Sequence, residues 1–329
     1  MLELRWQYIK NLEVEFSYIK SIIKKYFNYN VIESNLDQLL ENNNLENNYP
    51  DIDQFKLLSY IEEYSYKRMS ILVMRTLANG KTHPVYEELD NEAFKSIFKT
   101  KNGINNFDND EYIGDLDSIY KVVNYKEIGD HIIIKLACKE TRIELNIDDD
   151  GMESEEELSY YDCIKFIINI KQNKIFMFYN NTNKNANNVD FTKKKNAFYQ
   201  LFTKANRANI YHYTSNTILN AYFNEYYDEN INKNIRKSIS EIITESPMGD
   251  KNSVFSRTHN FRHSQERLKA IKSALDNEDH DISSIEILLN EKIIKIKGLG
   301  EIISNSILNK EVLKSVCEEF YPDFKIYEL

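Results

Sequence analysis

The chain has 329 residues, of which 42% are hydrophobic and 29% charged. This composition is typical of a folded globular protein and excludes a disordered one. The formal net charge of -10 argues against a protein that coats nucleic acid with its whole surface, because neutralising phosphates requires a local excess of Lys and Arg. The three Cys residues match neither a disulfide framework nor a four-ligand zinc site, which indicates a reducing compartment.

The N-terminal segment does not have the pattern of a signal peptide. It carries acids from its third residue and alternates charged with apolar positions, whereas a signal peptide needs a basic start and an unbroken apolar stretch. No stretch reaches the roughly 20 apolar residues that cross a bilayer. We therefore expect a cytoplasmic protein without membrane contact.

Residues 1–115 are expected to form a helical N-terminal region. Apolar residues recur at three- and four-residue spacing from Leu2 to Phe27, which is typical of an amphipathic helix. An Asn-rich stretch follows, and Asp53 is then placed to cap a second helical run that ends near Gly80. A polar, Gly-containing connection after this run predicts a domain boundary near residue 115.

Residues 116–248 are expected to form an α/β central domain, which makes the fold class α+β with a mixed or antiparallel sheet. Runs 164–170 and 175–179 are separated by four polar residues, a length that predicts an antiparallel β-hairpin. Helices are expected at 190–206 and 234–246, with a further strand at 210–214. The strand-like β-branched and aromatic runs are IYKVVNY, HIIIKLA, RIELNI, IKFIINI and IFMFY.

Residues 249–329 are expected to form a C-terminal helical module with the strongest charge asymmetry of the chain. Between Lys251 and Leu275 six basic residues accompany one acid, Glu266, which gives a local charge of +5. Such an excess is the electrostatic requirement for contact with phosphates. The six basic residues are Lys251, Arg257, Arg262, Arg267, Lys269 and Lys272.

A Gly-Leu-Gly sequence at 298–300 follows an apolar run that begins at Asp281 and that we interpret as a helix. Glycines at such a turn allow positive φ and close backbone approach. Their amides, together with the N-terminus of a following helix, would converge on a phosphate oxygen. The pattern consists of Ile296, Gly298, Leu299, Gly300, Ser304 and Ile307.

This pattern, within residues 281–309, resembles the helix-hairpin-helix DNA-binding motif. The resemblance implies contact with the DNA backbone, with Leu299 between two helices and Ser304 where they cross. Such hairpins usually bind DNA in pairs, and the sequence contains a single copy. The DNA contacts that the resemblance and the local charge imply are Lys295, Lys297, Gly298, Leu299, Gly300, Ser304, Arg262 and Arg267.

These features predict a DNA-binding protein that contacts the backbone without reading sequence. One hairpin on an acidic body would bind DNA weakly, which favours protein partners or a homo-oligomer in a DNA-handling or genome-defence (anti-phage) assembly. One alternative is a protein-interaction or adaptor subunit that does not bind nucleic acid, in which the glycine pair is a packing turn. Another is a nuclease whose active site is not recognisable in the sequence.

Two patterns suggest metal or phosphodiester chemistry and have simpler explanations. Residues 146–157 fall in the register of a calcium-binding EF-hand loop, but a strand precedes them where a helix is required, so an acidic turn explains them equally. Two Arg–His pairs have the spacing of HEPN-type ribonucleases, a spacing that also arises by chance. The pairs are Arg207 with His212 and Arg257 with His263.

The remaining patterns narrow the function classes further. Residues 191–212 interleave lysines with aromatics, which is typical of single-strand nucleic-acid binding or of a solvated helix face. The acid-x-Lys pattern of metal-dependent nucleases falls at Asp323–Lys325, in the C-terminal tail and not on a strand. No glycine fingerprint for nucleotides is present, so no cofactor is expected.

Overall fold

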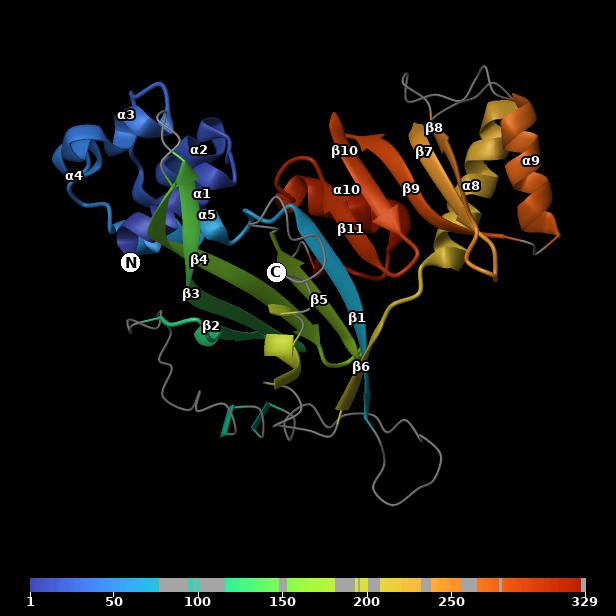
Figure 1. The fold of residues 1–329 in the computed structure, drawn as a ribbon, viewed down its shortest axis with the longest axis horizontal. Coiled ribbons are helices and arrows are strands. Elements are labelled where there is room, and N and C mark those ends of the chain that lie inside the picture. The colour runs from blue at the N-terminus through green and yellow to red at the C-terminus, as the bar shows by residue number, and fades with distance from the viewer. Residues whose placement is uncertain are drawn as a thin grey trace.

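The computed structural model combines helices with an antiparallel sheet of 11 strands (Figure 1). This arrangement confirms the α+β class. No helix among the placed residues is long and apolar enough to cross a membrane. The structure describes residues 1–76, 95–96, 99–100, 116–147, 153–180, 193–194, 196–200, 208–231, 238–255, 265–277 and 280–326.

Short helices at the N-terminus pack together at one end of the molecule (Figure 1). The single helix expected from Leu2 to Phe27 is two helices, because Glu13 adopts a φ of 54° between them. Asp53 caps the last of these helices as expected, by accepting hydrogen bonds from the amides of Phe55 and Lys56. The helices are α1 (Leu2–Asn11), α2 (Phe16–Phe27), α3 (Leu36–Leu40), α4 (Asn44–Asn48) and α5 (Gln54–Glu62), with a 3-10 turn at Glu41–Asn43.

The second helical run expected from Asp53 is wrong beyond α5. Residues Arg68–Thr76 form strand β1, whose Ser-Ile-Leu-Val-Met sequence is apolar on both faces. Such a run suits the centre of a sheet better than a one-sided helix. β1 is that centre, because it pairs with β5 along one edge and with β6 and β11 along the other.

The strands form one path in the order β2-β3-β4-β5-β1-β11-β10-β9-β7-β8, with β6 paired to β1. The hairpin expected at 164–179 is confirmed by the antiparallel β4–β5 pair, and the strand expected at 210–214 by β6. The strand bounds are β2 (Lys121–Ile128), β3 (His131–Ile147), β4 (Glu153–Asn169), β5 (Lys174–Tyr179), β6 (Ala208–His212), β7 (Ile239–Glu245), β8 (Lys251–Phe255), β9 (Asp281–Leu289), β10 (Lys292–Lys297) and β11 (Glu301–Ser304).

Two apolar cores lie on opposite faces of the sheet. The larger one joins the N-terminal helices to one face of the sheet and to the later helices. The smaller one covers the other face of β1 to β5, where Phe198 of the helical residues 196–200 stacks on Phe166. Those residues lie within the helix expected at 190–206. The later helices are α8 (Asn216–Ile231), α9 (Gln265–Asp276) and α10 (Lys310–Phe320).

The expected C-terminal helical module is wrong over residues 281–304, which form β9, β10 and β11. Isoleucines alternate along these strands at period two, with Ile285, Ile294 and Ile296 buried. Asn290 and Glu291 both have positive φ, the conformation of a two-residue hairpin turn. The helix interpretation mistook this alternation for a helical stripe.

The boundary expected at 248/249 falls in the turn between β7 and β8. These strands pair with each other in one hairpin of the common sheet. β7 also replaces the described part of the helix expected at 234–246, since its β-branched residues bury alternate side chains against β9. The sheet therefore continues through the expected division between central domain and C-terminal module.

Candidate functional site

The glycine pair does not form a helix-hairpin-helix. Gly298 and Gly300 lie in the turn between β10 and β11, and their amides are engaged inside the protein. The Gly298 amide donates to the Ser283 carbonyl at 2.7 Å, and the Gly300 amide donates to the Lys297 carbonyl at 2.9 Å. Neither amide points to a free phosphate position, so the geometry that motivated the resemblance does not occur.

Packing explains why both positions are glycine. A Cβ on Gly298 would lie 1.9 Å from Oδ1 of Asn216, and a Cβ on Gly300 would lie 2.8 Å from the carbonyl oxygen of Tyr213. Gly300 also has a φ of +70°, which disfavours other residues. The glycines let the segment between β6 and α8 cross directly over the turn.

The other residues of the motif are equally part of the sheet. Leu299 is 62% exposed and does not separate two helices. Ser304 is buried at the end of β11, where its amide donates to the carbonyl of Lys67. Arg262 lies outside the described residues, and Arg267 is exposed on α9.

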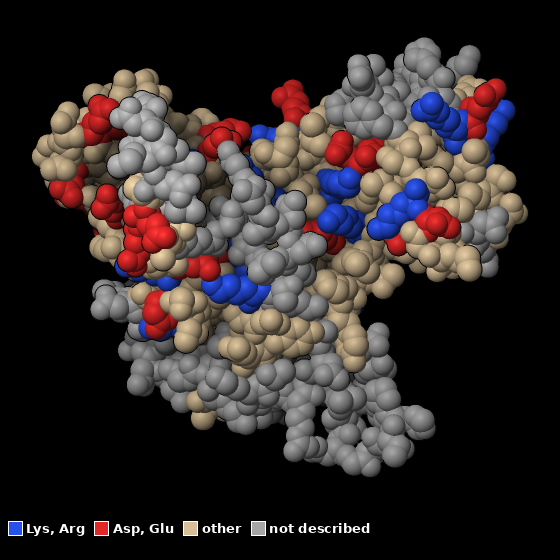
Figure 2. Space-filling model, viewed as in Figure 1, with Lys and Arg blue, Asp and Glu red and all other residues tan. Residues whose placement is uncertain are grey.

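Lys295 and Lys297 lie on a polar sheet face in which each cation has an acidic neighbour. Lys295 contacts Glu241 at 2.5 Å, and Lys297 contacts Glu301 at 2.5 Å. Arg68 of β1 approaches the same Glu301 carboxylate at 3.5 Å. Figure 2 shows basic and acidic atoms next to one another over β9, β10 and β11. This face has little charge excess for a polyanion.

Glu301 is the centre of this face. Besides the two cations, it accepts a hydrogen bond of 2.7 Å from the hydroxyl of Tyr179. Burial raises the pKa of Glu301, but the hydrogen bonds from Lys297 and Tyr179 and the nearby positive charges outweigh burial and leave this pKa below its usual value. The carboxylate therefore stays ionised at neutral pH.

α9 carries basic side chains of a different kind. Arg267 and Lys269 are exposed, and neither has a carboxylate partner within the described ranges. One turn further, Lys272 contacts Asp276 at 2.5 Å. α9 also buries Leu268 and Ile271 in the larger core. Arg267 and Lys269 are two positions apart, so their side chains leave the helix on either side of this buried stripe.

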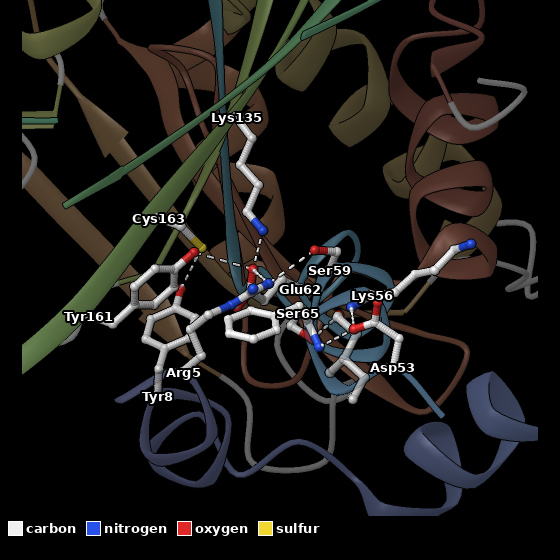
Figure 3. A network of polar contacts seen from close by, with 12 residues as sticks. Arg5, Tyr8, Asp53, Lys56, Ser59, Glu62, Ser65, Lys135, Tyr161 and Cys163 are labelled. Atoms are coloured by element: carbon white, nitrogen blue, oxygen red, sulfur yellow. Dashed lines mark hydrogen bonds and ion pairs between the residues drawn. The ribbon is translucent and has the colours of Figure 1, made fainter. Parts of the chain in front are cut away.

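A network of polar side chains joins the N-terminal helices to the sheet, with Glu62 at its centre (Figure 3). The Glu62 side chain is fully buried. Arg5 of α1 donates two hydrogen bonds to it, at 2.8 and 3.0 Å, and Lys135 of β3 pairs with the same carboxylate. Tyr161 of β4 is the third partner and donates a hydrogen bond of 3.3 Å. Three separate elements thus converge on one carboxylate.

Glu62 is held ionised although it is buried. Burial raises the pKa of this carboxyl, but the charges of Lys135 and Arg5 outweigh burial and leave the pKa below its usual value. Removing one partner of such a pair leaves an uncompensated charge in a low dielectric. The network therefore fixes how α1 and α5 sit on the sheet.

Beside Glu62, a thiol and tyrosines continue the network into the core. Cys163 donates to the hydroxyl of Tyr8 at 3.5 Å and lies 3.7 Å from the hydroxyl of Tyr66. Burial and nearby negative groups raise the pKa of Cys163 to about 11. This thiol is protonated and enclosed, which makes it a packing group and not a nucleophile.

Lys165 of β4 lies directly opposite Lys135 of β3 and pairs with the acid next to Glu62, Glu63, at 3.5 Å. Its ammonium lies 4.9 Å from the ring centroid of Tyr64. Burial lowers the pKa of Lys165, while Glu63 opposes this shift. A small hollow here is lined by Glu63, Tyr64, Tyr66, Lys165, Ile167, Phe178, Leu308, Leu313 and Ile326.

Two lysines of the mixed run 191–212 serve packing. Lys194 is fully buried and contacts Asp162 of β4 at 2.9 Å, and Lys193 contacts Glu140 of β3 at 2.8 Å. These pairs hold the helical residues 193–194 against β3 and β4. Because Lys194 is buried, it fits neither single-strand binding nor the solvated helix face expected for this run.

Several expected patterns fall where the structure gives no placement. Residues 148–152 of the EF-hand-like stretch, Arg207 of the first Arg–His pair and both residues of the second pair lie outside the described residues. In the part of the chain that is described, no group of three or more His, Cys, Asp or Glu side chains could hold a metal. The Glu62 network, in turn, was not expected from the sequence, because its partners are 57 to 99 positions apart.

No protein-family model and no curated protein sequence matches this chain.

Proposed function

We propose that this protein binds the sugar–phosphate backbone of nucleic acid without reading its sequence, through a basic end surface on α9 and β8. The observation that carries the proposal is the pair of exposed side chains on α9, Arg267 and Lys269, which have no carboxylate partner among the described residues. We include Lys251 of β8 and Lys272 because they belong to the same basic stretch of the chain, residues 251–275.

The local charge supports a polyanionic ligand. The chain carries a net charge of -10, but residues 251–275 carry +5. Lys251 and Lys272 each have one acidic contact, to Glu245 and Asp276. Exposed pairs of this kind contribute about 0 to 1 kcal/mol, so these lysines can exchange a carboxylate for a phosphate at small cost.

The glycine turn has no part in the proposal. Its amides are engaged, and the lysines of β10 have acidic neighbours. A few phosphate contacts give weak, salt-dependent binding. Weak binding is consistent with a component of a larger DNA-handling or genome-defence assembly, in which other subunits raise the effective affinity.

Fluorescence anisotropy with a labelled DNA duplex, at several salt concentrations, tests the proposal. The double variant Arg267→Ala, Lys269→Ala should bind more weakly, and its dependence of log K on log salt should be shallower by about 0.9 for each lost phosphate contact. The matched control is Lys310→Ala, Lys325→Ala, which removes two exposed lysines elsewhere. Equal loss in both double variants, or no binding by the wild type at low salt, would reject the basic end surface.

A protein-interaction role is the second candidate, supported by the polar face around Glu301. Its cations and carboxylates alternate across neighbouring strands, and charge complementarity of this kind suits a protein partner better than a polyanion. This role predicts that the wild type has no DNA affinity at any salt concentration.

A further inference from the structure

α2 presents a second basic surface at the opposite end of the molecule from α9 (Figure 1). Its twelve residues contain three lysines and no acid. Lys24 and Lys25 are exposed and have no carboxylate partner among the residues that are placed. The sequence offers no motif here, and none of these residues belongs to the basic end surface.

Aromatic rings accompany these lysines. Tyr26 stacks on Tyr60 of α5, with ring centroids 4.0 Å apart and ring planes 14° apart. Tyr26 is nevertheless 42% exposed. The ammonium of Lys25 lies 4.7 Å from the Tyr26 centroid, and because Tyr60 occupies one side of the ring, this ammonium lies over the other. The outer side of Tyr26 therefore faces the Lys25 ammonium, an exposed side chain, and the ring as a whole stays partly accessible to solvent.

A third exposed lysine lies on the same side of α5. Lys56 precedes Tyr60 by one helical turn, so both side chains emerge on one face. Figure 3 shows the Lys56 side chain pointing away from the buried network. We call the set of Lys24, Lys25, Tyr26, Lys56 and Tyr60 the tyrosine–lysine surface.

We propose that the tyrosine–lysine surface binds single-stranded nucleic acid, with one base stacked on the outer side of Tyr26 and the flanking phosphates held by Lys24, Lys25 and Lys56. An aromatic platform with cations beside it is the arrangement that binds unpaired bases without reading their sequence. The Lys25 ammonium leaves the ring for a phosphate as the base enters, which replaces one favourable contact by two.

The geometry favours single strands over duplexes. A base can stack on the Tyr26 ring only after it has left the neighbouring base. In a single strand this costs little, whereas in a duplex it also breaks base pairing and stacking. The cations are also confined to one short helix and the adjacent turn of α5, which matches a few nucleotides. This inference does not rest on the basic end surface.

The test is an anisotropy titration with labelled oligo(dT) and with a labelled duplex. Tyr26→Ala should weaken oligo(dT) binding by about 5- to 150-fold, the range for loss of one base–aromatic stack, and should leave duplex binding unchanged. Tyr26→Phe keeps the ring and should keep the affinity. Phe55→Ala is the matched control, because Phe55 is an exposed aromatic residue of α5 with 46% exposure.

The titration is repeated in the Arg267→Ala, Lys269→Ala background to separate the two surfaces. If the tyrosine–lysine surface acts independently, Tyr26→Ala has the same effect in both backgrounds, even if the basic end surface proves inactive. Unchanged oligo(dT) affinity in Tyr26→Ala, or an equal loss in Phe55→Ala, overturns the inference. Urea denaturation of each variant confirms that a loss of binding is not a loss of folding.

Discussion

Two carboxylates of this protein receive the same three kinds of partner in different surroundings. Glu62 is contacted by Arg5, Lys135 and a tyrosine hydroxyl. Glu301 is contacted by an arginine, a lysine and the hydroxyl of Tyr179. The Glu62 side chain is 0% exposed, whereas that of Glu301 is 19% exposed. The partner sets are alike in chemistry, so any difference in their importance comes from solvent.

The comparison separates attraction between charges from the cost of burying them. At the Glu301 face, water compensates each charge when its partner moves, so the pairs contribute little. In the Glu62 network no water replaces a missing partner, and every charge depends on the others. The same residue types therefore fix the N-terminal helices on the sheet at Glu62, whereas at Glu301 they form ion pairs that can exchange partners.

The largest expected effect is from Glu62→Ala. It leaves the buried Arg5 and the partly buried Lys135 beside each other without a counter-charge. This should lower the free energy of unfolding by about 3 to 5 kcal/mol. Urea denaturation followed by circular dichroism measures this. The matched variant Glu301→Ala should lose distinctly less, and equal losses would remove the distinction between the two sites.

Lowering the pH should reduce the stability that both carboxylates contribute, because the folded-state pKa of each is lowered. The folded-state pKa of Glu62 is lowered, so its contribution to stability is complete above the unfolded-state pKa of about 4.3 and disappears as the pH falls through the lower folded-state value. The urea midpoint of the wild type should therefore fall with pH below that value. Glu62→Gln should show a shallower fall, and an identical pH profile in the two proteins would contradict this assignment.

A substitution in the turn before Glu301 tests the surroundings of this partly exposed carboxylate. Gly300→Ala adds a Cβ 2.8 Å from the Tyr213 carbonyl at a φ of +70°, which should cost about 1 to 3 kcal/mol by strain alone. Gly129→Ala is the control, since Gly129 also has positive φ but has no atom within 4 Å of an added Cβ. Thermal unfolding should rank Gly300→Ala as the more destabilised variant. The reverse order would mean that the segment around Tyr213 moves away from the added methyl group.

The smallest effect is expected from Lys297→Ala. This lysine is partly exposed and shares Glu301 with two other groups, so its loss should change the free energy of unfolding by about 0 to 1 kcal/mol. A larger loss in urea denaturation would place the Glu301 face with the Glu62 network and not with exposed ion pairs.

Local sequence signals predicted the local parts of this fold. The Asp53 cap and the β4–β5 hairpin each depend on residues within a few positions of one another, and both are confirmed. The β9–β10–β11 meander was missed because apolar alternation and a Gly-Leu-Gly turn also fit a helical pattern when no partner strand is visible. Glycines at 298 and 300 serve contacts with residues 213–216, and sequence spacing carries no information about such contacts.

The Glu62 network was beyond sequence reasoning for a physical reason. Its acid lies in an unremarkable helix end, Glu-Glu, where both residues read as solvated. Only the sheet decides that Glu62 points inward to Lys135 and that Glu63 lies at the rim beside Lys165. The strand positions of the two lysines, one directly across from the other, would have been a usable signal once the β3–β4 pairing was known.

The central place of β1 has a consequence for how the chain is made. Residues 68–76 leave the ribosome early, but their partners are β5, β6 and finally β11 at residues 301–304. One edge of this apolar strand stays incomplete until residues 301–304 have been synthesised. Such distant pairing slows folding and leaves an open strand edge exposed to aggregation during synthesis. We expect the nascent chain to rely on chaperone protection until β11 has been synthesised.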